Sequence, residues 1–307
     1  MKKSLKILCS IIIGLVVIGL VITILYCAYA GPYSMNKETF DISKKEITED
    51  ITIMSFNIRY FAHDDFFKKS WFYRATLVVE NVKQEQPDII GFQEVQPIHE
   101  KYLRKHLEGY EFIIAYRTKL EPKEGMLLAY RKDRFTSEKE GMFWVSETPD
   151  KMSKDWGSQS YRVAAYAKLL DKKTNRYISP VDTHLDNVSE EAREKGIKVL
   201  IDQVNSLELE NAILMGDMND FDDTLMYKYA TSHGYNDALI IADKSYVGSG
   251  ATYQAYGKKL DHRRIDYFFL DTEFHVKNYH VVDKTYDGVY PSDHFPIAII
   301  INMTWKF

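Results

Sequence analysis

The feature that most constrains this chain is an uncharged, apolar run from Ile7 to Ala30, close to its N-terminus. A membrane-spanning helix needs about 20 apolar residues, whereas the apolar core of a signal peptide usually has about 7–15. The run is therefore long enough to cross a membrane. It also has no charged residue, whereas a helix that packs on the core of a soluble protein usually has a polar face. Lysines at positions 2, 3 and 6 precede the run and predict a cytoplasmic N-terminus, with the rest outside.

Ala28-Tyr29-Ala30 has the small-x-small pattern of a signal-peptidase site, so cleavage after Ala30 remains an alternative to an uncleaved anchor. We favour the anchor, which makes the chain a single-pass protein of the cell membrane; the cleaved alternative would be secreted. The chain then divides into a cytoplasmic stub (1–6), a transmembrane segment (7–30), a polar stalk (31–50) and one folded domain (51–307). In both cases the domain works outside the cytoplasm.

The composition of the remainder narrows its chemistry. Both cysteines, Cys9 and Cys27, lie in the apolar run, so thiol catalysis, cysteine-bound zinc and iron–sulfur clusters are excluded from the domain. The net charge is −4, and the first thirty residues contribute three lysines and no acid, which leaves −7 for the rest. An acidic balance of this size disfavours tight binding of nucleic acid.

Beyond residue 50, short β-branched and aromatic runs alternate with longer helical patterns. The expected strands are Ile51–Phe56, Asp88–Gln93, Phe112–Ala115, Met126–Tyr130, Ala164–Leu170, Tyr177–Thr183, Ile213–Met215, Arg264–Leu270 and Ile297–Met303. The expected helices are Trp71–Gln86, Pro97–Leu107, Ser189–Leu207 and Thr224–His233, with Ser189 as an N-cap. Many strands with fewer helices predict an α/β sandwich of two packed sheets flanked by helices.

Polar side chains gather where these strands begin or end. Asn57, Glu94, His184 and Asp217 each follow an apolar run, and further polar residues at such positions are Asp186, Asn219, Asp266, Asp293 and His294. Carboxylates, amides and histidines without a thiol make an oxygen-rich site suited to Mg²⁺ or Mn²⁺. No serine or cysteine nucleophile stands out, so attack by water on a phosphoester is the expected chemistry.

Six blocks of residues together resemble the endonuclease/exonuclease/phosphatase superfamily, which has the deoxyribonuclease-I-like fold. The blocks occur in the family's order across about residues 51–301: Ser-Phe-Asn-Ile-Arg at 55–59, Gly-Phe-Gln-Glu-Val at 91–95, Asp-Thr-His-Leu-Asp at 182–186, Gly-Asp-Met-Asn at 216–219, Arg-Ile-Asp-Tyr at 264–267 and Tyr-Pro-Ser-Asp-His-Phe-Pro at 290–296. The resemblance is to a compact bacterial type, and it implies a four-layer α/β/β/α sandwich of mostly antiparallel sheets.

The resemblance also implies a metal site and a phosphate site. Glu94 is the expected principal metal ligand, with Asn57 beside it at the metal and the phosphate, and Asp293 completing the metal shell. The metal is expected to be Mg²⁺, with Mn²⁺ as an alternative. Arg162, in Ser-Tyr-Arg-Val, is at a position where many family members contact phosphate.

Five residues are expected to carry the hydrolysis itself. Asp217 corresponds to the residue that orients or deprotonates water, and Asn219 holds that water or a phosphoryl oxygen. His294 binds the scissile phosphate and is oriented by Asp266, while His184 contacts the phosphate or protonates the leaving oxygen. Asp186 is open between a functional and a structural role.

Fold and site do not name the substrate. Gln96 stands where DNA-cutting relatives often have an arginine, and the net charge also disfavours DNA. We therefore expect a monomeric, Mg²⁺-dependent phosphodiesterase or phosphatase acting on a lipid headgroup or small molecule at the outer membrane surface. A DNA or RNA endonuclease is the alternative, and a catalytically inactive, tethered binding domain is a weaker one.

Overall fold

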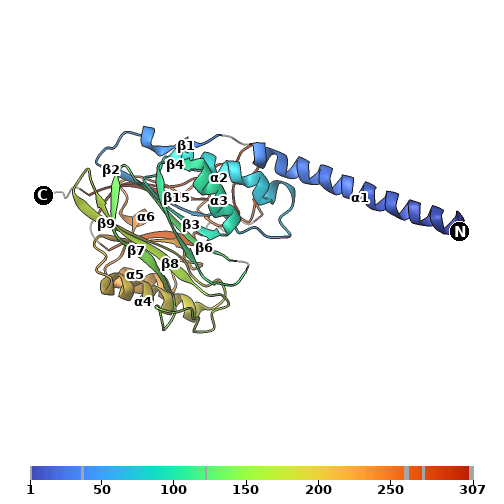
Figure 1. The fold of residues 1–307 in the computed structure, drawn as a ribbon. Coiled ribbons are helices and arrows are strands. Elements are labelled where there is room, and N and C mark those ends of the chain that lie inside the picture. Colours follow the sequence, from blue (N-terminus) through green and yellow to red (C-terminus); the bar gives the residue numbers. More distant parts are fainter. Residues whose placement is uncertain (1, 36–37, 122, 259–262, 272–273, 304–307) are drawn as a thin grey trace.

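In the computed structural model, one long helix projects from a layered α/β domain (Figure 1). The structure describes residues 2–35, 38–121, 123–258, 263–271 and 274–303. Helix α1 spans Lys2–Met35, and its segment Lys6–Tyr26 is long and apolar enough to cross a membrane. By length and composition the same segment is compatible with a signal sequence.

The first sheet has seven strands. Their spatial order is β12 (Ser245–Tyr246), β14 (His275–Val281), β15 (Ile297–Asn302), β2 (Asp50–Asn57), β3 (Ile89–Val95), β6 (Gly125–Arg131) and β5 (Tyr110–Tyr116). The β2–β3 and β12–β14 pairs are parallel, and the other neighbours are antiparallel.

The second sheet has six strands. Their order is β11 (Asn236–Asp237), β13 (Asp266–Leu270), β10 (Ala212–Asp217), β9 (Arg176–His184), β8 (Val163–Asp171) and β7 (Phe135–Trp144). Only β9 and β10 are parallel among these described strands. Both sheets are therefore mostly antiparallel, as predicted.

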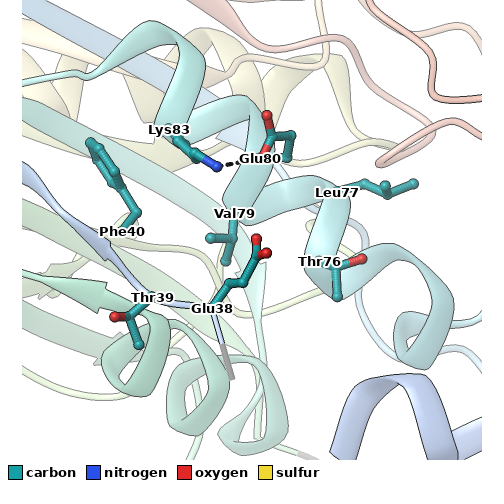
Figure 2. A pocket seen from close by; sticks show the side chains of 8 residues that line it. All are labelled: Glu38, Thr39, Phe40, Thr76, Leu77, Val79, Glu80 and Lys83. Atoms are coloured by element: carbon teal, nitrogen blue, oxygen red, sulfur yellow. Dashed lines mark ion pairs between the residues drawn. The ribbon is translucent and has the colours of Figure 1, made fainter. Parts of the chain in front are cut away.

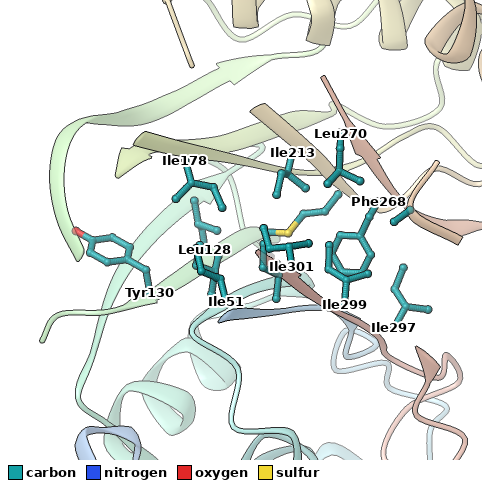
Figure 3. Packing of buried hydrophobic residues seen from close by; sticks show 14 of the residues in the cluster. Ile51, Leu128, Tyr130, Ile178, Ile213, Phe268, Leu270, Ile297, Ile299 and Ile301 are labelled. Carbon is teal, nitrogen blue, oxygen red and sulfur yellow. The ribbon is translucent and has the colours of Figure 1, made fainter. Parts of the chain in front are cut away.

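The main core lies between the two sheets, and helices cover their outer faces. Ile51, Leu128, Ile178 and Ile213 are fully buried at the sheet–sheet interface, as Figure 3 shows. Helices α2 (Trp71–Glu85) and α3 (Pro97–His106) pack on the first sheet, and α4 (Glu190–Ser206) and α5 (Leu225–Ser232) pack on the second. This arrangement confirms the predicted four-layer sandwich.

All nine predicted strands and all four predicted helices are present, with shifted ends. Ser189 is the N-cap of α4, since its hydroxyl accepts a hydrogen bond from the Ala192 amide. Strands β7 and β14 were not predicted. β7 is an edge strand whose middle residues are exposed and charged, and a bulge between Val276 and Asn278 interrupts the alternation of β14. Helix α6 (Ala238–Ile241) and the short strands also carry too little periodicity to be recognised.

Much of the segment expected as a stalk packs against the domain. β1 (Phe40–Asp41) pairs with β4 (Leu107–Glu108), and Ile42 is fully buried in the short 3₁₀ helix η1 (Ile42–Lys44). The Lys45 ammonium contacts the Asp88 carboxylate at 3.0 Å. At its other end the expected stalk overlaps α1, which extends to Met35, and residues 36 and 37 lie outside the described ones.

Candidate active site

The parallel pairs β2–β3 and β9–β10, one from each sheet, end side by side and place the polar residues of the sequence blocks together. Asn57 is opposite Gln93 at the end of the β2–β3 pair, and His184 is opposite Asp217 at the end of the β9–β10 pair. A cleft of about 850 Å³ opens there. Of the nine predicted site residues, those lining the cleft are Glu94, Arg162, His184, Asp217, Asn219, Asp293 and His294. Asn57 and Asp266 lie behind them and are buried.

Asn57 connects the two sheets at the floor of the cleft. Its Nδ2 lies 3.0 Å from Asp217 Oδ2 and 3.3 Å from Glu94 Oε1. The other oxygen of Glu94 accepts a hydrogen bond from the Tyr60 amide at 2.8 Å. Asn57 therefore sets the separation of two carboxylates that come from different sheets.

An irregularity in β3 directs Glu94 into the cleft. The pairing of β3 with β6 shifts between Phe92 and Val95, and Glu94 has a φ of 62°. A bulge changes the side to which a side chain points, and positive φ is uncommon for a residue other than glycine. As a result Gln93 points into the core, where it bonds Asp182, while Glu94 faces the cleft.

Asp217 is held by an equally constrained turn. Gly216 has a φ of 135°, and a Cβ at this position would lie 1.9 Å from the Thr183 carbonyl oxygen, so only glycine fits. Asn219 has a φ of 50°, and its backbone N–H donates to Asp217 Oδ1 at 2.9 Å. This turn keeps Asp217 Oδ2 directed toward the two histidines.

The contacts of His184 fix its tautomer. Asn219 Nδ2 donates to the Leu185 carbonyl at 3.1 Å and lies 2.8 Å from His184 Nε2. Because the side-chain nitrogen of Asn219 can only donate, His184 Nε2 must accept the hydrogen bond. The ring proton of the neutral His184 is therefore on Nδ1. Burial, with the nearby charge of Arg162, lowers the pKa of His184 well below its usual value. The imidazole is therefore neutral.

His294 has the opposite charge state. Its Nδ1 lies 3.0 Å from Asp266 Oδ2, and its Nε2 lies 3.6 Å from Asp217 Oδ2. Burial opposes protonation, but the carboxylates of Asp266 and Asp217 outweigh it and raise the pKa of His294 to about 10. Burial raises the pKa of Asp217 to about 7, an effect that His294 opposes.

Arg162 is held at the rim by the loop that follows β9. Its Nη2 donates to Asn187 Oδ1 at 2.9 Å, and its Nε lies 3.5 Å from Asp186 Oδ2. Asp186 also accepts the amides of Val188 and Ser189, which outweigh burial and lower its pKa to about 2. Asp186 does not line the cleft, and its contacts give it a structural role.

Three charged residues of the cleft were missed in the sequence. Glu124 contacts Arg117 at 2.8 Å, and Arg59 lies 3.7 Å from Asp293. Glu124 precedes β6 and Arg117 follows β5, so both lie at the ends of predicted strands, where a closer inspection would have found them. Burial, together with the charge of Glu94, raises the pKa of Glu124 to about 7.

The donor set of the cleft fits a hard divalent cation. Glu94, Glu124 and Asp293 bring carboxylates to one cavity. Burial, and after it the charge of Glu94, raises the pKa of Glu124, and a bound cation would offset both effects. Asp217, Asp266 and His294 also have ligand atoms within 4.8 Å of one another. A protonated imidazole cannot bind a metal, so the charge of His294 favours the first group.

Comparisons with known proteins find similarity over most of the domain. The model of the Endonuclease/Exonuclease/phosphatase family matches residues 54–294. The endonuclease/exonuclease/phosphatase of Bacteroides vulgatus is 29% identical with a TM-score of 0.77, over 83% of this chain and 99% of that one. The mannosyl-6-phosphatase of Bacteroides thetaiotaomicron is 27% identical with a TM-score of 0.76, over 82% and 99%. The uncharacterized protein L388 of Acanthamoeba polyphaga mimivirus is 26% identical over 75% and 91%.

Proposed function

The chain belongs to the endonuclease/exonuclease/phosphatase family and is thus a phosphoester hydrolase, and we propose that it is a Mg²⁺-dependent one acting at the outer surface of a membrane. The observation that carries this proposal is the convergence on Asp217 Oδ2. Asn57 Nδ2, His184 Nε2 and His294 Nε2 lie 3.0, 3.5 and 3.6 Å from it, at the floor of an open cleft.

Asp217 is proposed to orient and deprotonate the attacking water. A general base works best when its pKa is near the working pH, and the pKa of Asp217 is raised to about 7. The protonated His294 supplies a positive charge for a phosphoryl oxygen, and Asp266 holds its ring. Asn219 is proposed to hold the attacking water through its side-chain oxygen, because its Nδ2 already donates to Leu185 and His184. The neutral His184, whose Nε2 carries no proton in this arrangement, is proposed to position Asn219 beside the phosphate site.

Glu94, Asn57 and Asp293 are proposed to hold the metal, with Glu124 nearby. When bound, Mg²⁺ would polarise the phosphoryl group and neutralise charge that develops on its oxygens. Arg162 and Arg117 provide further positive charge for the phosphate at the rim of the cleft. This division leaves Asp217 and the two histidines to the water and the phosphate.

We favour a lipid headgroup or a small phosphorylated molecule over nucleic acid as substrate. The charge of −7 outside the first thirty residues supports this choice, as does the similarity to a mannosyl-6-phosphatase. Gln96 points the same way, because its side chain accepts the Phe61 amide at 3.0 Å and offers no positive charge. Anchoring through α1 would hold the enzyme at the membrane surface.

The proposal is tested by hydrolysis of bis-p-nitrophenyl phosphate. Replacement Asp217→Ala is expected to lower kcat about 10³-fold, because the general base is lost. Chelation of divalent ions should abolish activity, and Mg²⁺ should restore it. Asp223→Ala, an exposed carboxylate on the following loop, is the matched control and should remain active. Full activity of the Asp217 variant would refute the assigned role.

A second measurement tests the metal ligands. Glu94→Gln is expected to weaken Mn²⁺ binding in calorimetry by at least about tenfold. Even replacing a residue that only hydrogen-bonds a metal ligand lowers metal affinity by about 10–100-fold. Glu191→Gln, which changes an exposed helix carboxylate paired with Lys195, is the control. Equal affinity in both variants would place the metal elsewhere. Parallel assays on plasmid DNA, RNA and phospholipid vesicles separate the nuclease alternative.

A further inference from the structure

The loop between β2 and α2 exposes a group of aromatic side chains. Phe66 and Phe67 have 65% and 73% of their surface exposed. Phe61, earlier in the same loop, and Tyr73, in the first turn of α2, are less exposed, at 39% and 43%. We name the adjacent pair Phe66 and Phe67 the aromatic patch. Scattered exposed apolar residues are normal, whereas adjacent, strongly exposed aromatic residues at one loop tip form a continuous apolar surface that can bind a partner.

The loop is held in place at its base, so this exposure is not that of a frayed segment. The Arg59 guanidinium contacts Asp65 at 3.2 Å, the Phe61 and Phe72 rings meet edge to face at 5.4 Å, and the Lys69 ammonium lies over the Tyr256 ring. Its tip is strained, because Phe67 has a φ of 53°, which is unfavourable for a bulky residue. Strain of this kind at an exposed aromatic residue suggests a functional constraint.

The patch lies on the side of the domain where α1 arrives. The 3₁₀ helix η2 (Phe67–Lys69) leads into α2, and α1 lies against α2 where Figure 1 shows it meeting the domain. Figure 2 shows the chain that follows α1, Glu38–Phe40, running past α2 at Thr76 and Lys83 around a small pocket. In Figure 1 the β2–α2 loop is on the face from which α1 projects.

We propose that the aromatic patch inserts into the interfacial region of the membrane that α1 crosses, as a second membrane contact. This inference rests on the anchoring role of α1 in the proposed function. Aromatic rings favour the membrane–water interface, and the stem of Lys68 can extend to the headgroups. Because Asp64 and Asp65 balance Lys68 and Lys69, the attraction is apolar rather than electrostatic.

The contact would set the orientation of the active site. Residues at the start of the same loop, Arg59, Tyr60 and Phe61, line the catalytic cleft. Insertion of the loop tip therefore brings the cleft mouth next to the bilayer surface. The substrate class that fits this orientation is a phosphoester carried by a membrane lipid.

Spin-label depth measurements on the full chain test the proposal. Phe66→Cys and Phe67→Cys are labelled in a Cys9→Ser, Cys27→Ser background and reconstituted into phosphatidylcholine vesicles. Relative access of oxygen and of a water-soluble nickel complex gives the depth of each label. The matched control is Ile240→Cys, because Ile240 is 71% exposed and lies on α6, away from α1 (Figure 1). Ile18→Cys, in the middle of the apolar run, reports on the anchor itself.

Labels at positions 66 and 67 are expected to favour oxygen at least several-fold over the label at 240. Equal values at 66, 67 and 240, with a deep label at 18, would overturn the patch contact and leave the anchor intact. An aqueous label at 18 would overturn the anchor and the patch contact together. A third outcome is spectral broadening of the labels at 66 and 67 that disappears on dilution with unlabelled protein. This result would show that the patch contacts a second copy of the chain, and it would also overturn the proposal.

Discussion

At the scale of single residues, the buried carboxyl of Asp182 is a titratable group that has no role in the proposed mechanism. Gln93 Nε2 donates to Asp182 Oδ1 at 2.6 Å, across the interface of the two sheets. Gln93 Oε1 and Asp182 Oδ2 have no hydrogen-bond partner. Burial raises the pKa of Asp182 well above its usual value, and we expect the carboxyl to be protonated, with its O–H as a donor for Gln93 Oε1. The Gln93–Asp182 pair joins the two sheets next to Glu94 in the sequence.

This pair predicts a pH-dependent effect of Asp182→Asn. With a native pKa above the unfolded value of about 3.8, the unfolded chain releases the proton first, so stability falls as pH rises above that value. Asparagine keeps both hydrogen bonds without a titration. Its Tm should therefore exceed that of the native chain at neutral pH by a few degrees, and the difference should shrink toward pH 4. Thermal unfolding between pH 4 and 8 measures it.

Asp182→Ala is the contrasting variant. It removes the Asp182 partner of Gln93, which is expected to cost about 1–3 kcal/mol near pH 4 and less as the pH rises. A Tm difference between the asparagine variant and the native chain that does not change with pH would contradict a protonated Asp182.

At the scale of elements, α2 holds the loops of the site through one buried arginine. Arg74 Nη1 donates to the Ile58 carbonyl at 2.7 Å and to the Pro291 carbonyl at 2.8 Å. Its Nε donates to the Lys69 carbonyl at 2.6 Å. One helix thus joins the segment after Asn57 to the segment before Asp293, although these are more than 200 positions apart in the chain.

Arg74→Met should therefore destabilise the domain and disturb the site together. It leaves several buried carbonyl groups unpaired, which is expected to cost about 3 kcal/mol or more in chemical unfolding. Arg104→Met, which alters an arginine that is 40% exposed on α3, should change stability by no more than about 0.5 kcal/mol. Equal losses in the two variants would show that Arg74 has no special bracing role.

At the scale of the whole molecule, α1 and the domain differ in the solvent that suits them. None of the Lys6–Tyr26 segment of α1 is buried against the rest of the structure, and its side chains are mostly exposed apolar groups. The domain buries its own core between two sheets. A membrane around α1 would remove this exposed surface from water.

The proposed topology has a direct biochemical test. The chain should stay in the membrane pellet after carbonate extraction, and protease added to intact spheroplasts should digest the domain. N-terminal sequencing separates an anchor that begins at Met1 from a secreted form that begins at Gly31. Digestion only after permeabilisation would reverse the proposed orientation.

Local pattern was sufficient for most of the fold. The central strands are buried on both faces, so runs such as Ile89-Ile90-Gly91-Phe92 are apolar without interruption and are easily recognised. The polar residues at the ends of those strands could be assigned to one site because the six sequence blocks follow the order of the family they resemble. Strand β7 could not be found in this way, since a solvated edge strand has neither an apolar run nor a clean alternation.

The sequence alone determined the membrane-length helix, the sandwich and the set of polar residues at strand ends, because hydrophobic periodicity and residue order are local properties. Only the tertiary structure decided the charge states of His184 and His294, the pairing of Glu124 with Arg117 and the placement of residues 38–45 on the domain. The reason is physical. Burial and electrostatic coupling depend on side chains that approach through space, and Asn57 and Asp217 meet across 160 positions of chain.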